Sequence, residues 1–406
     1  MIFLAFILVN VNSFIRFRQF SEVENFSTNE LDYIFIGVIT IMLVIFLLWK
    51  GQLSPKYFEA WKKNKFLVAF LAYAMVSALW TIYLPATLNK LFFLLFSTIL
   101  GSYIAVRYGR SGSLDVLTWI GAICCVLSIW IVQFLPFIGV MQNEPFVGSW
   151  TGMFWHRNHT GNIFAFFNMI FLFRFLLDDE STRLEKTLFA FFYILTALIV
   201  FGSRSATGII VFLFLHFVVG LVVIWLKFNP RIKRWHYYAS GLALLAGFLV
   251  FITNTDFFFG LLGRSSNMTG RVPLWLDLFQ NFYLQNPLFG SGFGALWMLK
   301  SFRIQMQIRH GWPYQVYFAD NGFFDILLNT GLVGLLLFMF SYLSYGLRSF
   351  RQAIRIKSWL YFFPLLTFLY ILIGNLTYSF LLEVDQFVWM IFIIMAFITT
   401  ETKQTS

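Results

Sequence analysis

Long apolar blocks separated by short polar segments run along almost the whole chain. Most blocks are long enough to cross a hydrocarbon layer of ~30 Å as a helix. Their apolar residues are continuous rather than confined to one helical face, which is typical of membrane spans and not of surface helices in a soluble bundle. The twelve candidate spans cover approximately residues 2–15, 33–49, 66–84, 88–106, 116–140, 162–177, 187–201, 206–226, 238–253, 322–345, 358–374 and 386–398.

This pattern predicts an all-α polytopic membrane protein of about 12 transmembrane helices, or 11 if the first is absent. No polar stretch is long enough for a separate soluble domain, so we expect one integral membrane domain over residues 1–406. Residues 1–15 are also compatible with a cleavable signal peptide. However, no basic segment precedes them and no small-residue cleavage site follows, which favours a short first span.

The basic residues predict the orientation of the spans. Alternate connections hold 19 of the 29 Lys and Arg residues, and basic residues near span ends are retained in the cytoplasm. These connections are 50–65, 107–110, 174–186, 227–234, 348–357 and the C-terminal Lys403. We therefore expect both termini in the cytoplasm, and we expect the extracytoplasmic loops to be 16–32, 141–161, 202–205, 254–321 and 375–385.

Composition adds little to this picture once topology is known. The formal net charge of +11 would suggest nucleic acid as the partner of a soluble protein. Here membrane orientation accounts for most of the charge, so we expect membrane lipids and no nucleic acid as partners. The two cysteines, Cys124 and Cys125, are adjacent in an apolar block, which suits neither a disulfide nor a metal cluster.

The basic residues on the predicted outer side are mainly arginines. Arginine offers a planar, permanently charged fork that matches phosphate, whereas lysine is a hydrated point charge. Arg204 lies in a very tight link between two spans, where a charge near hydrocarbon costs up to ~2.5–3.5 kcal/mol and needs a partner. We expect that partner to be an anionic ligand. Contact with lipid headgroups explains Arg16, Arg18 and Arg264 equally well.

The connection 254–321 is unusually long, and loops of this length are commonly functional. Within it, Pro273 predicts the first turn of a helix over 274–283 that lies along the membrane surface. Arg271 would lie just before this helix, where the free N–H groups and the helix dipole also favour an anion. The glycines of 286–294 lack the βαβ context of a nucleotide site, and they predict a compact turn or close backbone approach to a substrate.

Two further polar groups lie at predicted span boundaries. Asp320 and Asp325 are acids at the end of the large loop, and Asp320 is either a helix N-cap or a catalytic carboxylate. His156 and His159 have a metal-ligand spacing, but no third ligand is identifiable. Contact of the 155–161 segment with substrate, or hydrogen-bonded packing at the membrane interface, explains these two histidines better than a metal site does.

Four of these segments together resemble the O-antigen ligase and polymerase superfamily, including exopolysaccharide polymerases of the ExoQ kind. The resemblance covers roughly Trp150 to Leu337, and the segments are 155–158, 202–205, 270–292 and 319–334. It implies a GT-C-like glycosyltransferase that uses a polyprenyl-pyrophosphate sugar donor without metal or cofactor. It also implies that Arg204 and Arg271 bind pyrophosphate. Many family members, ligases especially, carry His where this chain has Asp320, which weakens the ligase assignment.

We therefore expect a surface polysaccharide (O-antigen or exopolysaccharide) polymerase. It would join undecaprenyl-pyrophosphate-linked oligosaccharide repeats on the outer face of the bacterial cytoplasmic membrane. The expected catalytic residues are Arg204, Arg271 and Asp320, with His310 as a second candidate base. The expected substrate-binding residues are His156, Arg157, Asn158, Ser203, Trp275, Asn321 and His310. Polysaccharide export or chain-length proteins are candidate partners.

Two other functions fit the same features. A ligase that transfers finished glycan to a lipid or protein acceptor would share the arginines. A lipid-linked oligosaccharide flippase or other transporter also suits a dozen spans with cationic residues. Transporters usually show related halves and polar breaks at the membrane midplane. Here no convincing repeat is seen, and the polar residues concentrate in outer loops of the second half.

Overall fold

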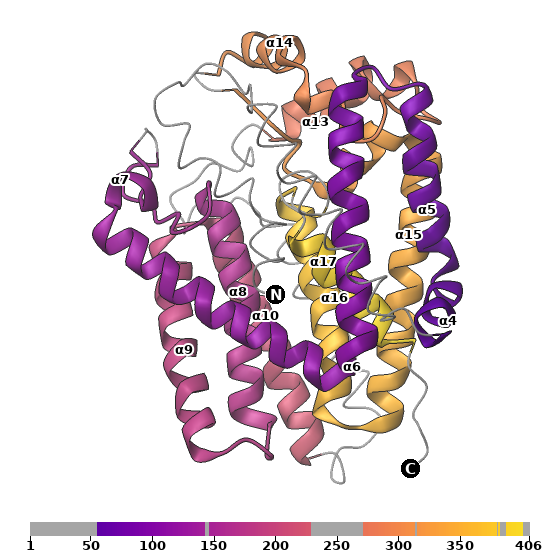
Figure 1. The fold of residues 1–406 in the computed structure, drawn as a ribbon. Coiled ribbons are helices and arrows are strands. Elements are labelled where there is room, and N and C mark those ends of the chain that lie inside the picture. Colours follow the sequence, from indigo (N-terminus) through magenta and orange to yellow (C-terminus); the bar gives the residue numbers. More distant parts are fainter. Residues whose placement is uncertain are drawn as a thin grey trace, which may run out of the picture.

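The computed structural model describes residues 55–142, 146–228, 271–312, 315–379, 381 and 387–400. The expected spans at 2–15, 33–49 and 238–253 lie outside these ranges, as do Arg16, Arg18 and Arg264. The described part is helical, and its only β-type pairing is an isolated bridge between Val140 and Trp150. Figure 1 shows the helices standing side by side in an upright bundle.

Every apolar block predicted within the described ranges forms a helix. The helices are α4 (Pro55–Lys63), α5 (Lys65–Val76), α6 (Leu84–Phe134), α7 (Pro136–Gly139), α8 (Arg157–Leu177), α9 (Arg183–Gly202), α10 (Ala206–Phe228), α13 (Arg271–Asn281), α14 (Lys300–His310), α15 (Gly322–Ile356), α16 (Trp359–Thr377) and α17 (Phe387–Ile398). Short 3-10 turns cover Ser77–Leu79, Tyr283–Gln285 and Leu296–Met298.

Six of the described helices are long and apolar enough to cross a membrane, namely α6, α8, α9, α10, α15 and α16. Two shorter apolar helices, Lys65–Leu79 and Phe387–Ile398, accompany them. The chain is therefore an all-α, multi-pass membrane protein, as its hydrophobic pattern predicts. The total number of spans and the single-domain organisation stay predictions.

Two of the long helices are broken at a glycine. Gly109 interrupts α6 with φ 61° and ψ −162°, and Gly331 interrupts α15 with φ 64° and ψ −172°. A side chain strongly disfavours this left-handed region, so glycine permits each break. The break in α6 explains why two predicted spans, 88–106 and 116–140, appear as the two arms of one bent element (Figure 1).

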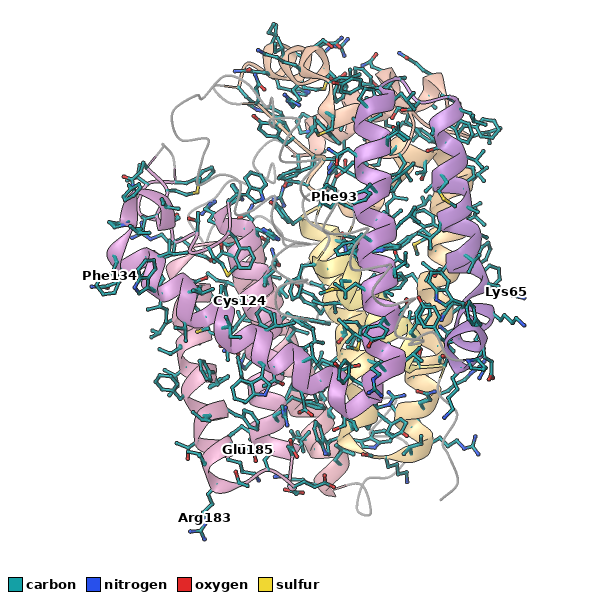
Figure 2. The ribbon with its side chains drawn as sticks, in the orientation of Figure 1. Lys65, Phe93, Cys124, Phe134, Arg183 and Glu185 are labelled. Atoms are coloured by element: carbon teal, nitrogen blue, oxygen red, sulfur yellow. The ribbon has the colours of Figure 1, made fainter. Side chains whose placement is uncertain are left out.

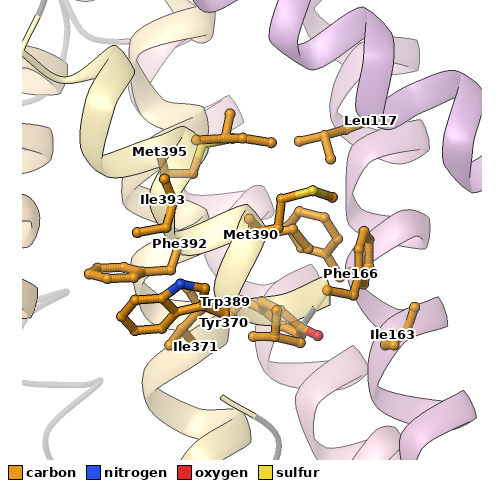
Figure 3. Packing of buried hydrophobic residues seen from close by; sticks show 14 of the residues in the cluster. Leu117, Ile163, Phe166, Tyr370, Ile371, Trp389, Met390, Phe392, Ile393 and Met395 are labelled. Carbon is orange, nitrogen blue, oxygen red and sulfur yellow. The ribbon is translucent and has the colours of Figure 1, made fainter. Parts of the chain in front are cut away.

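The C-terminal helix α17 lies in the centre of the bundle. All its residues are buried, and Figure 3 shows Trp389, Met390 and Ile393 among side chains from neighbouring helices. Trp389 donates from Nε1 to Thr98 Oγ1 at 2.7 Å, which satisfies the one polar atom of this large ring. On the α6 side, Gly101 lets the backbone of α17 approach closely, because a Cβ there would lie 3.1 Å from the Met390 carbonyl O.

The connections rich in basic residues and the large loop lie at opposite ends of the bundle. Figure 2 shows Arg183 and Glu185 at the lower end, whereas α13 and α14 of the large loop lie at the upper end (Figure 1). Side-chain contacts join several basic connections at the lower end; for example, Arg110 bonds to Gln352 and Arg348 bonds to Asn64. This grouping agrees with the alternation predicted from Lys and Arg. Which end faces the cytoplasm stays a prediction.

Candidate functional site

Helix α8 begins in the 155–158 segment because His156 caps it. The backbone of His156 is extended, and its Nδ1 accepts a hydrogen bond from the Asn158 N–H at 3.2 Å. Such a bond satisfies one of the donors left open at a helix start. The Asn158 side chain in turn accepts from Ser205 Oγ at 3.0 Å. The start of α8 is therefore tied to the tight link between α9 and α10.

The link 202–205 is rigid because its own hydroxyl groups hold its backbone. Ser203 Oγ donates to the Val200 carbonyl O at 2.6 Å and accepts from the Ser205 N–H at 3.2 Å. Behind the link, Gly161 and Gly208 bring α8 and α10 into backbone contact, since a Cβ on Gly208 would lie 2.7 Å from the Gly161 Cα. The Ser203 hydroxyl is thus already used in hydrogen bonds that hold the backbone of the link.

Two arginines meet at this link but differ in exposure. Arg157 is 4% exposed; its guanidinium carbon lies 3.9 Å from the Phe146 ring centroid, and its Nη1 donates to the Arg204 carbonyl O at 2.7 Å. Arg204 is exposed and takes a left-handed conformation with φ 49°. Within the described residues, the Arg204 side chain makes one long hydrogen bond, to the Val147 carbonyl O at 3.4 Å. A well-supported cation with unused donors suits an anionic ligand.

On the other side of the site, Arg271 pairs with Asp320. Arg271 is the first described residue of α13, is 8% exposed, and donates from Nε to Asp320 Oδ2 at 2.9 Å. Asp320 also has a left-handed backbone, with φ 55°. Helix α13 confirms the helix expected after Arg271. Its orientation along a membrane surface stays a prediction, with Val272, Leu276 and Phe279 exposed on it.

The N-cap of α15 is Asn321 and not Asp320. Asn321 Oδ1 accepts from the N–H groups of Phe323 and Phe324, both at 3.1 Å. Capping therefore does not account for Asp320, whose carboxylate instead contacts Arg271. The Trp275 side chain also contacts this turn, because its Nε1 donates to the Ala319 carbonyl O at 2.6 Å.

A cluster of four aromatic rings joins the two sides of the site: Trp155, His156, Phe318 and Tyr378. The Phe318 ring centroid lies 6.1 Å from that of Trp155 and 4.9 Å from that of Tyr378, which is itself parallel to His156 at 6.2 Å. This aromatic cluster connects the segment before Asp320 to the segment that supports Arg204. The connection between Arg204 and Arg271 is thus indirect and runs through these ring contacts.

The glycine-rich segment of the large loop packs on the break in α15. The N–H of Leu332 donates to the Pro287 carbonyl O at 2.8 Å, and the N–H of Gly292 donates to the Asn329 carbonyl O at 2.9 Å. A Cβ on Gly290 would lie 2.5 Å from the Gly331 backbone N. The close backbone approach predicted for these glycines therefore exists, and the backbone that they approach is that of α15.

His310 lies in a separate polar group on the large loop. It ends α14, its Nε2 lies 3.1 Å from Asp277 Oδ2, and its ring stacks on Trp312. Arg309 bonds to the same carboxylate. The structure thus brings His310 to Asp277 of α13, whereas Asp320 pairs with Arg271. A role for His310 as base has no support from this placement.

The remaining chemistry of the site is that of anion binding beside a carboxylate. Among the residues that the structure describes, no group of three His, Cys, Asp or Glu side chains could hold a metal ion.

Sequence reasoning missed Phe318, Tyr378 and the helix α14. An aromatic residue just before 319–322 and another just after the α16 span were the available signals for the first two.

Comparison with family models supports the resemblance drawn from these segments. Residues 191–339 match a model described as O-Antigen ligase, a family that includes both ligases and polymerases. The match covers Arg204, Arg271 and Asp320 and ends before Tyr378. Comparison with curated proteins found no match. Residues 191–339 of this multi-pass membrane protein are therefore similar to the O-antigen ligase and polymerase superfamily.

Proposed function

We propose that the protein is a glycosyltransferase that polymerises lipid-linked oligosaccharide repeats at the outer face of the cytoplasmic membrane. The donor is a growing glycan on undecaprenyl pyrophosphate, and the acceptor is a sugar hydroxyl of the next lipid-linked repeat. The similarity of residues 191–339 to a family of glycosyltransferase-like enzymes supports the reaction class. The choice of a polymerase and of this donor is our proposal.

The observation that carries the proposal is the pairing of Arg271 with Asp320. One cation and one carboxylate lie 2.9 Å apart at the start of α15, although 49 residues separate them in the sequence. Within the described residues this ion pair uses only Nε of Arg271, so its two Nη groups can donate to phosphate oxygens. Asp320 is half-buried and provides an acceptor for a proton. A group that can stabilise negative charge and a group that can accept a proton thus lie side by side.

In the proposed reaction, the acceptor hydroxyl oxygen attacks the anomeric carbon of the donor sugar. The new glycosidic C–O bond forms while the C–O bond to pyrophosphate breaks, and the hydroxyl proton passes to the Asp320 carboxylate. Undecaprenyl pyrophosphate leaves with the bonding electron pair. Arg204 and Arg271 stabilise the charge that builds on it. The energy of the reaction is stored in the donor's bond to pyrophosphate, so no nucleoside triphosphate is needed.

The other expected contacts act in support of these groups. Arg157 and Asn158 hold the link that carries Arg204, and Trp275 and Asn321 hold the turn that carries Asp320. His156 belongs to the aromatic cluster that connects the segment supporting Arg204 to the segment before Asp320. Direct substrate contact by these side chains stays a prediction.

The test is reconstitution of the purified full-length protein with undecaprenyl-pyrophosphate oligosaccharide as sole substrate. We expect a ladder of longer glycans together with release of undecaprenyl pyrophosphate. If product forms only when a second lipid or protein acceptor is added, the protein is a ligase and the polymerase proposal is wrong. Movement of the lipid-linked sugar across the bilayer without a glycosidic product would instead indicate a transporter.

A further inference from the structure

A buried carboxylate in the first turn of α15 bonds to the residue next to Asp320. Asp325 is 1% exposed, and its oxygens accept hydrogen bonds from a tryptophan side chain and from a backbone N–H group. Trp297 Nε1 donates to Oδ1 at 2.7 Å, and the N–H of Ala319 lies 3.1 Å from both Oδ1 and Oδ2. The acid thus binds the backbone of the residue that immediately precedes Asp320.

Ala319 is held on both sides by side chains, one from the nearby first turn of α15 and one from the distant helix α13. Its N–H bonds to Asp325, and its carbonyl O accepts from Trp275 Nε1 at 2.6 Å. Fixing both polar groups of one residue restricts the rotation of the peptide that follows it. The neighbouring Asp320 adopts φ 55°, a left-handed conformation that is uncommon for any residue with a side chain, although Asp takes it more readily than most.

We infer that Asp325 is a positioning residue for the proposed reaction: its carboxylate holds the N–H of Ala319, the residue before Asp320, so that the Asp320 carboxylate meets Arg271. This inference rests on the proposed function for its catalytic consequence. The large loop takes part through Trp297, whose carbonyl O accepts from Nη1 of the buried Arg303 at 2.8 Å. Asp325 itself does not touch the reacting groups.

The first experiment measures the turn without measuring activity. Asp325→Asn removes the negative charge, and its amide N–H group replaces one of the two oxygens that lie 3.1 Å from the Ala319 N–H, so the bond to Ala319 weakens. We expect hydrogen exchange at 316–321 to quicken at least tenfold, with exchange in α9 unchanged. Unchanged exchange at 316–321 would overturn the inference even if the protein proves to be a polymerase.

The second experiment is a double-mutant cycle on turnover of lipid-linked repeats by the reconstituted protein. If Asp325 acts through Asp320, Asp325→Asn alone lowers kcat about 10- to 100-fold, but it changes kcat less than about threefold in an Asp320→Asn background. Asp115→Asn, which alters a carboxylate paired with Arg174, serves as the matched control and leaves kcat unchanged. Multiplicative losses in the double variant would show a role independent of Asp320.

A milder variant keeps the inference testable if Asp325→Asn does not accumulate. Trp297→Phe removes the indole donor and keeps the ring, so Asp325 retains its bonds to Ala319. We expect a kcat loss of less than about tenfold, which also disappears in the Asp320→Asn background. If wild-type protein makes no glycan from any lipid-linked repeat, the proposed function fails, whereas the exchange result still decides the positioning role.

Discussion

Arg110 and Arg348 at the lower end of the bundle are used differently from Arg204 at the upper end. At the lower end, Arg348 donates from Nη2 to Asn64 Oδ1 at 2.7 Å and to the Ala396 carbonyl O at 3.3 Å. Arg110 donates from its Nη2 to Gln352 Oε1 at 2.8 Å and to the Ile398 carbonyl O at 3.0 Å. Both therefore satisfy carbonyl groups at the C-terminal end of α17. At the upper end, Arg204 is exposed and makes one long bond within the described residues.

This difference separates structural cations from cations suited to a ligand. A guanidinium whose donors are bound to backbone carbonyls stabilises the fold and cannot bind phosphate without losing those bonds. Arg204 instead has a backbone fixed by neighbours and a side chain with donors to spare. Arg271 lies between these cases, because it is buried but its partner is a carboxylate and not a carbonyl.

The largest effect is expected from Arg271→Ala. Loss of this charge should reduce polymerisation about 100- to 1,000-fold, comparable with removal of one oxyanion-stabilising donor. Arg271→Lys should not restore activity, because lysine lacks the planar fork. The measurement is glycan chain length and released undecaprenyl pyrophosphate per amount of folded protein. Normal chain lengths from Arg271→Ala would remove this residue from the mechanism.

Arg204→Ala should reduce activity about 10- to 100-fold without lowering thermal stability, because the exposed side chain loses only one long bond. Arg351→Ala is the matched control, since Arg351 is also exposed but lies in a basic connection at the opposite end. Its activity should equal that of the wild type. Equal losses in both variants would mean that general surface charge matters, and not an anion site at Arg204.

Arg348→Ala should show the opposite behaviour. Removal of its bonds to Asn64 and the end of α17 should destabilise the fold by about 1.5–3 kcal/mol, the range for hydrogen bonds to charged groups. Turnover per folded molecule should be unchanged. Thermal unfolding in detergent and the activity of the remaining folded fraction test both statements. A selective loss of turnover at full stability would contradict the structural role.

The two helix breaks provide the smallest and most local comparison. Alanine at Gly109 or at Gly331 should cost about 1–2 kcal/mol because of the left-handed backbone. At Gly331 a Cβ would also lie 2.3 Å from the Leu288 carbonyl O, so the glycine-rich segment must move. Gly331→Ala should therefore be the less stable variant and should lose more activity. Equal unfolding temperatures would show that this contact is unimportant.

Local pattern was sufficient to predict the helices and several of their ends. Continuous hydrophobicity forces a membrane-embedded backbone to satisfy its own hydrogen bonds, so each apolar block within the described ranges forms a helix. The start of α8 at the 155–158 segment follows from short-range capping. Helix α14 was missed because its sequence, Lys300–His310, has few apolar residues, and its burial depends on Phe302 and Met306 packing under the loop.

Chain folding alone decided which polar residues meet. The sequence marked Arg204, Arg271 and Asp320 as candidates, but only the packing of α13 against the start of α15 brings Arg271 to Asp320 across 49 residues. Packing within the large loop likewise pairs His310 with Asp277. The cap at Asn321 and the bond of Asp325 to Ala319 are local contacts around the start of α15. Hydrophobicity and capping depend on neighbours along the chain, whereas an ion pair between distant residues depends on which segments share one place.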